Sequence, residues 1–303
     1  MRKFFQKPFA YAIVFAVFLT ALSVYVLLQT YLIPTVEGYV TQSEDLSDIS
    51  YEDAKLNAVI NDMSYSDDNI KISIETVREY ETEIYIADVT LSSAEFLKTA
   101  LANNAFGNNV TQKTSEIAQE NNAILAINGD YYGANRRGYV IKNGVLYRDT
   151  VRKDNEYDDL AVYQNGAFEI INESDISAQT LVDSGVQDLF SFGPALVKNG
   201  KITVSEGEEV GKAMSENPRT AIGIIDGLHY ILLVSDGRTS ESDGLSLYQV
   251  AEIMQQYGCQ IAYNLDGGGS STMYFNGKII NNPTTNGKKI SERAVSDIVY
   301  IGY

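Results

Sequence analysis

The chain has 303 residues, a formal net charge of −17 and a hydrophobic content of 45%. This length allows one large domain or two ordinary ones, and the composition is typical of a globular protein with a sizeable core. The negative charge argues against a nucleic-acid partner held by general electrostatic attraction. A single cysteine, Cys259, excludes an intrachain disulfide framework. A single histidine, His229, excludes a His-Glu-x-x-His metal motif and argues against a Ser-His-Asp triad.

An apolar run at the amino terminus predicts a transmembrane signal anchor over residues 9–33. Arg2, Lys3 and Lys7 lie in the preceding residues 1–8, so the positive-inside rule places this end in the cytoplasm. The alternative is a cleaved signal peptide, but its apolar region would be only about 7–15 residues long. We therefore expect a single-pass protein of the cell membrane with its carboxy-terminal domain outside the cytoplasm. An outside domain without disulfides fits a bacterium, which we expect to be Gram-positive.

Residues 34–69 are acidic and predict a stalk, and residues 70–303 predict one folded domain. Apolar and polar residues alternate at the period of a strand over residues 70–75 and 82–89. A capping box of Ser92 and Glu95 predicts a helix over residues 92–101. Other helices are expected from Thr114 and after Ser246. Hairpins with Asn-Gly turns are expected over residues 140–147 and 160–170. Further strands are expected over residues 123–127, 190–197, 221–225, 230–234, 273–275 and 298–303. The sequence thus predicts an α+β fold, mostly β, with a mixed sheet and three or four helices.

Two of the predicted strands end in polar, glycine-containing loops. Residues 123–127 lead into Asn128, Gly129 and Asp130, and a second apolar run leads into residues 264–273. The glycines there leave backbone N–H groups unshielded and free to turn towards an anionic oxygen. The alternative for each loop is an ordinary hairpin turn. The sequence of the second loop is Asn264-Leu265-Asp266-Gly267-Gly268-Gly269-Ser270-Ser271-Thr272-Met273.

Arginines gather beside these loops. The chain has nine arginines, and planar guanidinium groups hold phosphate or carboxylate oxygens through paired hydrogen bonds. The clustering predicts a local anion site in an acidic domain, with structural ion pairs between strand ends as the alternative. No P-loop and no Gly-x-Ser-x-Gly elbow is present. The arginines in question are Arg136, Arg137, Arg219, Arg238 and Arg293, and the carboxylates among them are Asp130, Asp236, Asp243, Asp266 and Glu292.

Five motifs in this order resemble those of the phosphodiester glycosidases, the family of the mannose-6-phosphate uncovering enzyme. They cover residues 126–132, 218–223, 236–238, 264–273 and 292–296. The resemblance implies hydrolysis of the bond between a sugar's anomeric carbon and a phosphodiester oxygen. The animal enzyme acts on N-acetylglucosamine linked in this way and has cysteine-rich additions that are absent here, so its substrate does not carry over.

The resemblance also assigns expected roles. Asp266 and Asp130, followed by Glu292, are the candidates for a carboxylate that attacks the anomeric carbon or activates water. No cofactor is expected, and an oxygen-liganded cation at Asp236 or Asp266 is not specified by any motif. The candidates for binding phosphate or sugar are Asn128, Gly129, Arg219, Thr220, Asp236, Arg238, Asn264, Gly267, Gly268, Gly269, Ser270, Ser271 and Arg293.

A second hypothesis keeps the arginines but needs no catalytic carboxylate. A membrane-anchored, non-catalytic protein could bind or help assemble an anionic surface polysaccharide. Location outside the membrane makes exopolysaccharide a plausible target of either activity. Release of free sugar separates the two hypotheses, because only the enzyme produces it.

Overall fold

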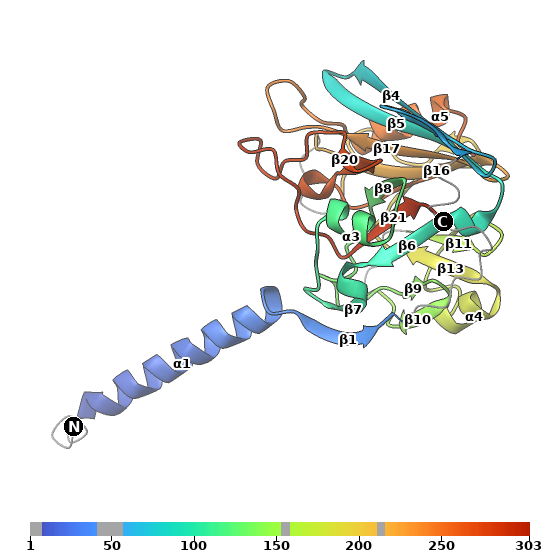
Figure 1. Cartoon of the computed structure of the whole chain (residues 1–303). Coiled ribbons are helices and arrows are strands. Elements are labelled where there is room, and N and C mark those ends of the chain that lie inside the picture. Colours follow the sequence, from blue (N-terminus) through green and yellow to red (C-terminus); the bar gives the residue numbers. More distant parts are fainter. Residues whose placement is uncertain (1–7, 41–56, 153–157, 211–215) are drawn as a thin grey trace.

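The computed structural model describes residues 8–40, 57–152, 158–210 and 216–303. Helix α1, Pro8–Tyr31, is 24 residues long and projects away from the rest of the chain (Figure 1). Its segment Phe9–Tyr31 has a mean hydropathy of 2.4, so it is long and apolar enough to cross a membrane. The remaining described residues form two main sheets with three helices, which confirms the predicted α+β class.

The larger sheet has nine strands, and all of its recorded strand pairs are antiparallel. Long, alternating sequences build its centre, where β4 and β5 pair along ten residues each. The order across the sheet is β15 (Lys201–Ile202), β14 (Ala195–Lys198), β18 (Ile261–Asn264), β16 (Thr220–Asp226), β17 (His229–Ser235), β5 (Thr82–Leu91), β4 (Ile70–Glu79), β3 (Ser64–Ser66) and β2 (Val59–Asn61).

The second sheet has five strands and carries most of the predicted site loops at its end. Its order is β20 (Lys278–Ile279), β19 (Met273–Phe275), β8 (Leu125–Asn128), β21 (Asp297–Ile301) and β6 (Leu97–Leu101). Three smaller sheets pair β1 (Thr35–Tyr39) with β7 (Ala105–Asn108), β9 (Val140–Lys142) with β10 (Val145–Arg148), and β11 (Asp159–Tyr163) with β12 (Phe168–Ile171) and β13 (Val186–Phe190).

The main core lies between the two large sheets. Ile72 and Leu232 of the nine-stranded sheet are fully buried in one cluster with Ile127 and Phe275 of the five-stranded sheet. The other face of the nine-stranded sheet is covered by α5 (Leu247–Gln256), the helix expected after Ser246, and Ser246 caps this helix through a capping box with Gln249. The remaining helices are α3 (Thr114–Glu120) and α4 (Ala178–Asp183), with 3-10 turns η1 (Ala94–Phe96), η2 (Ala102–Asn104) and η3 (Gly268–Ser270).

The structure differs from the prediction in three places. The helix predicted over residues 92–101 is wrong, because only the turn η1 forms there and β6 follows as an edge strand paired with β21. The strand predicted over residues 190–197 is divided, because β13 ends at Phe190 and β14 begins at Ala195, and the Gly193–Pro194 peptide bond between them is cis. The boundary placed at residue 70 falls inside the nine-stranded sheet, since β2 and β3 already belong to it. Residues 41–56 of the predicted stalk lie outside the described residues.

Candidate functional site

The five-stranded sheet brings two of the predicted loops into contact at the end of β8. The side-chain amide of Asn128 donates to the carbonyl of Asp266 at 2.6 Å, and the N–H of Asp266 donates to the carbonyl of Gly129 at 3.2 Å. Thr220, at the start of β16, donates its hydroxyl to the Asn128 Oδ1 atom at 2.8 Å. Asn128 is completely buried, so it joins three strand ends and does not face a ligand.

Asp266 lies on the wall of a cavity of about 210 Å³. Its Oδ2 atom accepts a hydrogen bond from the Ser270 hydroxyl at 2.6 Å and from Arg293 Nη2 at 3.0 Å. Burial raises the pKa of the Asp266 carboxyl above its usual value, and the charge of Arg293 partly offsets that rise. Among the described residues around this cavity, Asp266 is the one carboxylate. The other wall residues are Asn109, Thr111, Tyr131, Gly133, Ala134, Ser270, Arg293, Ala294, Val295 and Ser296.

Arg293 connects the carboxylate of Asp266 to the glycine loop and keeps part of its guanidinium group available to a ligand. Its Nε and Nη2 atoms donate to the Ser270 hydroxyl oxygen at 2.9 and 2.6 Å, and Nη2 also donates to the Gly267 carbonyl at 3.2 Å. Its Nη1 atom forms no hydrogen bond to any of the described residues. The side chain is 39% exposed, so a ligand oxygen can reach it.

The glycine loop is more closed than the sequence predicts. Residues 268–270 form the turn η3, and the N–H groups of Gly268, Ser270 and Ser271 already donate to backbone carbonyls. Within the predicted cradle of residues 267–271, at most Gly267 and Gly269 can turn an N–H towards a ligand. Ser271 and Asn264 are also completely buried.

The other predicted arginines differ in position. Arg219 is buried behind the loop, where it pairs with Glu209 and donates to the Leu245 carbonyl at 2.8 Å. Arg238 lies against the glycine loop. A Cβ atom added to Gly268 would be 2.9 Å from the Nη2 atom of Arg238. Burial lowers the pKa of Arg238, and the nearby positive charge of Arg293 lowers it further. Arg238 and Arg293 therefore form the cationic side of the loop, and Arg219 supports it from behind.

Three of the predicted carboxylates hold neighbouring segments. Asp130 is buried, with Oδ1 accepting the Tyr131 N–H at 2.6 Å and Oδ2 accepting the Ser191 N–H at 2.6 Å. Asp236 accepts from the N–H of Asn282 at 2.7 Å. Glu292 points at the start of α3, where its two oxygens accept the N–H and the hydroxyl of Ser115 at 3.0 and 2.6 Å. None of the three lies on the wall of the Asp266 cavity among the described residues.

Sequence reasoning did not identify a buried ion pair beneath the site. Lys142 Nζ lies 2.8 Å from Asp297 Oδ2, and both side chains are almost completely buried. Asp297 also accepts the N–H of Asp130 at 2.7 Å and leaves no room for a Cβ on Gly129. The sequence signal for this ion pair is Asp297 itself, a single carboxylate at the start of the otherwise apolar strand β21. Among the described residues, no group of three or more His, Cys, Asp or Glu side chains is placed to hold a metal ion.

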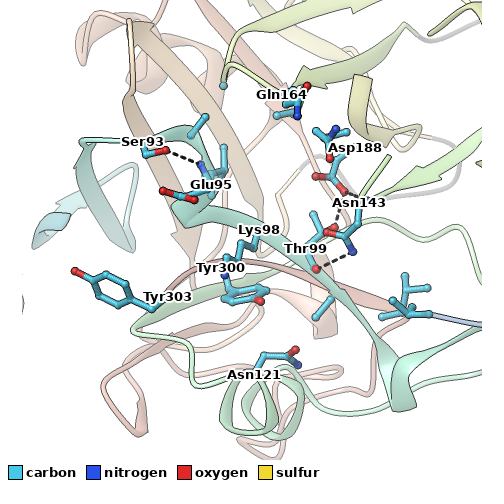
Figure 2. Close-up of a pocket in the computed structure, with 18 of the residues that line it drawn as sticks. Ser93, Glu95, Lys98, Thr99, Asn121, Asn143, Gln164, Asp188, Tyr300 and Tyr303 are labelled. Carbon is cyan, nitrogen blue, oxygen red and sulfur yellow. Dashed lines mark hydrogen bonds between the residues drawn. The ribbon is translucent and has the colours of Figure 1, made fainter. Parts of the chain in front are cut away.

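A larger cleft, of about 810 Å³, lies along the edge strand β6. Its wall includes Lys98 and Tyr300, and Figure 2 shows Thr99 hydrogen-bonded to Asp188 and to Asn143 on another side. None of the predicted catalytic or phosphate-binding residues lines this cleft in the described part of the chain. We place the candidate site at the smaller cavity, because the carboxylate of Asp266, the cation of Arg293 and the glycine loop meet there.

Comparison with known proteins identifies a family for this chain. Residues 121–302 match the family described as phosphodiester glycosidase. The SPbeta prophage-derived protein YomE of Bacillus subtilis is 27% identical over 265 residues, which are 82% of this chain and 40% of that protein. The mouse N-acetylglucosamine-1-phosphodiester alpha-N-acetylglucosaminidase is 31% identical over 140 residues, which are 40% of this chain and 27% of the enzyme. The chain therefore spans less than half the length of these curated relatives.

A solved structure resembles the fold. The catalytic domain of the zebrafish N-acetylglucosamine-1-phosphodiester alpha-N-acetylglucosaminidase, auto-inhibited by its pro-peptide, superposes with a TM-score of 0.60 at 22% identity. The superposition covers 77% of this chain and 83% of that domain.

Proposed function

We propose, since the chain belongs to the phosphodiester glycosidase family, that the Asp266 cavity hydrolyses the glycosidic bond of a sugar-1-phosphodiester. The observation that supports this most directly is the contact of Asp266 with Ser270 and Arg293 on one cavity wall. A carboxylate and a partly free guanidinium group are the two functions that the reaction requires. The mammalian relatives are named for N-acetylglucosamine-1-phosphodiesters, which are therefore the first substrates to test.

The proposed reaction breaks the bond between the anomeric carbon and the phosphodiester oxygen. The phosphate leaves with the bonding electron pair as a phosphomonoester, and a water oxygen forms the new bond to the anomeric carbon. One proton of that water passes to the Asp266 carboxylate and then to solvent or to the phosphate. A phosphate leaving group is already a weak base, so the site needs less help from a general acid than an ordinary glycosidase does.

Arg293 has two roles in this proposal. Its Nη2 atom fixes the Asp266 carboxylate, and its Nη1 atom is free to bind a phosphate oxygen. Arg238 adds positive charge on the other side of Gly268. Preorganised cations next to the developing negative charge of the leaving phosphate stabilise the transition state. A carboxylate that acts as a base must be ionised, and the cation of Arg293 favours that form in a buried position.

The test uses the full chain in detergent with the methyl ester of N-acetylglucosamine-1-phosphate, and it follows free reducing sugar. Asp266→Asn keeps the size of the side chain and should lose at least about two orders of magnitude in rate. The matched control is Asp68→Asn, since Asp68 is an exposed carboxylate away from the cavity. Full activity of the Asp266 variant would remove that residue from the mechanism.

The alternative is non-catalytic binding or assembly of an anionic surface polysaccharide. It uses the same cations, Arg238 and Arg293, but makes no use of a buried carboxylate beside them. Binding of a polymeric glycan phosphodiester without release of sugar, equally in the parent and in Asp266→Asn, would favour it. The contact between Asp266 and Arg293 leads us to prefer the hydrolase.

The predicted location completes the proposal. Helix α1 would anchor the protein in the cell membrane as a single-pass protein, with its amino terminus in the cytoplasm and the catalytic domain outside. Exopolysaccharide and other cell-surface phosphodiesters would then be accessible to the domain. Protease protection of residues 57–303 in inverted membrane vesicles tests the orientation, and digestion of the domain there would contradict it.

A further inference from the structure

The Asp266 cavity lies at the end of the apolar helix. Asn109 lines this cavity, and its side-chain amide donates to the backbone carbonyls of Thr30 at 3.1 Å and Ile33 at 3.3 Å. The N–H of Asn109 donates to the carbonyl of Gly133, another wall residue of the cavity, at 3.0 Å. One residue therefore connects the catalytic cavity with the carboxy-terminal end of α1.

A strand pair fixes this arrangement. Immediately after α1, β1 pairs with β7 in antiparallel register from Thr35 opposite Asn108 to Tyr39 opposite Ala105. Glu37 accepts a further hydrogen bond from the Asn108 side chain at 3.0 Å. The sequence predicts a stalk that separates the domain from the membrane, whereas residues 35–39 attach the end of α1 directly to the domain. Figure 1 shows α1 leading into β1 beside β7.

The length of α1 gives the depth of this attachment in a membrane. At about 1.5 Å per residue a 24-residue helix is roughly 36 Å long, and the hydrocarbon core is about 30 Å thick. The end of a spanning α1 therefore reaches the headgroup layer. Tyr31, the last residue of α1, is 70% exposed there, as is usual for tyrosines at a membrane–water interface. Asn109 binds within one helical turn of Tyr31, so the cavity lies at the level of the headgroups.

The cavity wall also carries positive charge, because Arg293 lies on it with its side chain 39% exposed. Tyr131 of the cavity wall is exposed, and the segment that follows it contains the exposed residues Arg136 and Arg137. Arginines at a membrane surface attract the phosphates of anionic lipids. The strongly negative chain thus has exposed cations on the cavity wall and in the segment that follows Tyr131.

We infer that the substrate is a sugar phosphodiester whose phosphate is esterified to a lipid of the same membrane. The lipid phosphate would lie in the headgroup layer, level with Arg293, and the sugar would enter the Asp266 cavity. This inference rests on the proposed hydrolysis and on α1 crossing the membrane, and it adds the class of the leaving group. The products are free sugar and a lipid monophosphate, and water is the only other reactant.

The experiment compares two esters of N-acetylglucosamine-1-phosphate with the full chain reconstituted in phospholipid vesicles. One is the hexadecyl ester, incorporated into the same vesicles, and the other is the soluble methyl ester at the same bulk concentration. Confinement to one surface raises the effective concentration, so the hexadecyl ester should react about a hundredfold faster. Placing the hexadecyl ester in separate vesicles should remove that advantage.

A variant with a spacer distinguishes the effect of the cavity's height above the membrane from simple partitioning of the hexadecyl ester into vesicles. Five EAAAK repeats inserted between Ile33 and Pro34 form a semi-rigid spacer of about 37 Å, which lifts the cavity away from the surface. The spacer should leave hydrolysis of the methyl ester unchanged and lower that of the hexadecyl ester at least about tenfold. A glycine–serine insert of the same length is the control, because a flexible linker lets the domain return to the membrane.

The outcomes are distinguishable. Equal rates for the two esters, or an undiminished rate on the hexadecyl ester with the rigid spacer, would overturn the lipid inference and leave the proposed hydrolase intact. Hydrolysis of neither ester would contradict the proposed function, and the inference would fall with it.

Discussion

The carboxylate of Asp297 accepts the backbone N–H of Asp130 at 2.7 Å while it pairs with Lys142 at 2.8 Å. Asp297 thereby fixes the turn after β8, since the N–H of Gly129 also donates to the Asp297 carbonyl at 2.9 Å. The same turn also contacts the loop of Asp266, because the carbonyl of Gly129 accepts the N–H of Asp266 at 3.2 Å. A buried ion pair below the cavity thus positions the loop that carries the proposed catalytic carboxylate.

Removing one member of this pair should be costly. Asp297→Asn leaves the Lys142 charge buried without its counter-ion, and we expect a loss of about 3–5 kcal/mol in the free energy of unfolding. The Lys142→Met change on that background replaces the stranded charge, which lies 3.8 Å from the centre of the Phe190 ring, with an apolar group. The double variant should be more stable than Asp297→Asn alone. Chemical denaturation measures all three, and strictly additive losses would contradict the pairing.

The same carboxyl should make stability depend on pH. Burial, as the main cause, raises the pKa of Asp297 from 3.8 to about 6 in the folded protein. A raised folded pKa means that protonated Asp297 contributes stability below about pH 4, and this contribution is lost as the pH rises towards 6. The free energy of unfolding of the parent, relative to that of Asp297→Asn, should therefore fall between pH 4 and 6. Parallel curves for the two proteins would refute this assignment.

Local sequence patterns predicted much of the fold but not how its segments meet. Alternation identified β4 and β5, and the amphipathic pattern after Ser246 identified α5, because these signals agree with the tertiary structure. The capping box at Ser92 predicted a helix that does not form, because pairing of β6 with β21 outweighs the helical pattern of residues 92–101. Helix α4 was not predicted.

The candidate site was predicted in part for the same reason. The sequence identified the loop around Asp266 and the motif with Arg293, which lie together. It did not show that Glu292, the neighbour of Arg293, points the other way towards Ser115. Adjacent residues on an extended segment face opposite sides, and only the packing of α3 decides which one meets the cavity. The contact between Asn109 and the end of α1 has no sequence signal at all.

The position of Glu292 distinguishes it from Asp266 as a catalytic candidate, because only Asp266 of the two lies on the cavity wall. Glu292→Gln should retain hydrolysis close to that of the parent, because the side chain caps α3 and does not line the cavity. It should lower the free energy of unfolding by about 1 kcal/mol through the lost negative charge at a helix amino terminus. Reducing-sugar assays and denaturation provide the two measurements. Loss of hydrolysis with unchanged stability would restore Glu292 as a catalytic residue.

A side chain at residue 268 should displace Arg238 from the glycine loop. Gly268 has a φ of +61°, and an added Cβ would approach Arg238 Nη2 to 2.9 Å. Gly277→Ala is the matched control, since its φ is +89° and nothing lies within 4 Å of an added Cβ. Both variants should lose about 1–2 kcal/mol of unfolding free energy from backbone strain. Only Gly268→Ala should also raise KM, because it displaces the Arg238 guanidinium, and equal KM values would argue against Arg238 as a substrate contact.

Arg293 should control both binding and the pH dependence of hydrolysis. Its charge lowers the pKa of Asp266, which burial raises. In Arg293→Gln that opposing influence is gone, so the pKa of Asp266 should rise further. The acid limb of the kcat/KM profile should therefore move to higher pH, since the carboxylate must be ionised to act as a base. The value of kcat/KM at its maximum should fall by about two to three orders of magnitude, because a group that stabilises the leaving phosphate is lost.

Arg293→Lys is the matched control for charge. Lysine keeps the positive charge near Asp266 but cannot reproduce the simultaneous contacts of Nε and Nη2 with Ser270 and Asp266. The acid limb should then stay close to that of the parent while kcat/KM still falls, because the free Nη1 atom of the planar group is lost. Measuring kcat/KM across pH for the parent and both variants distinguishes the two effects. An acid limb that is the same in all three proteins would show that Asp266 is not the titrating base.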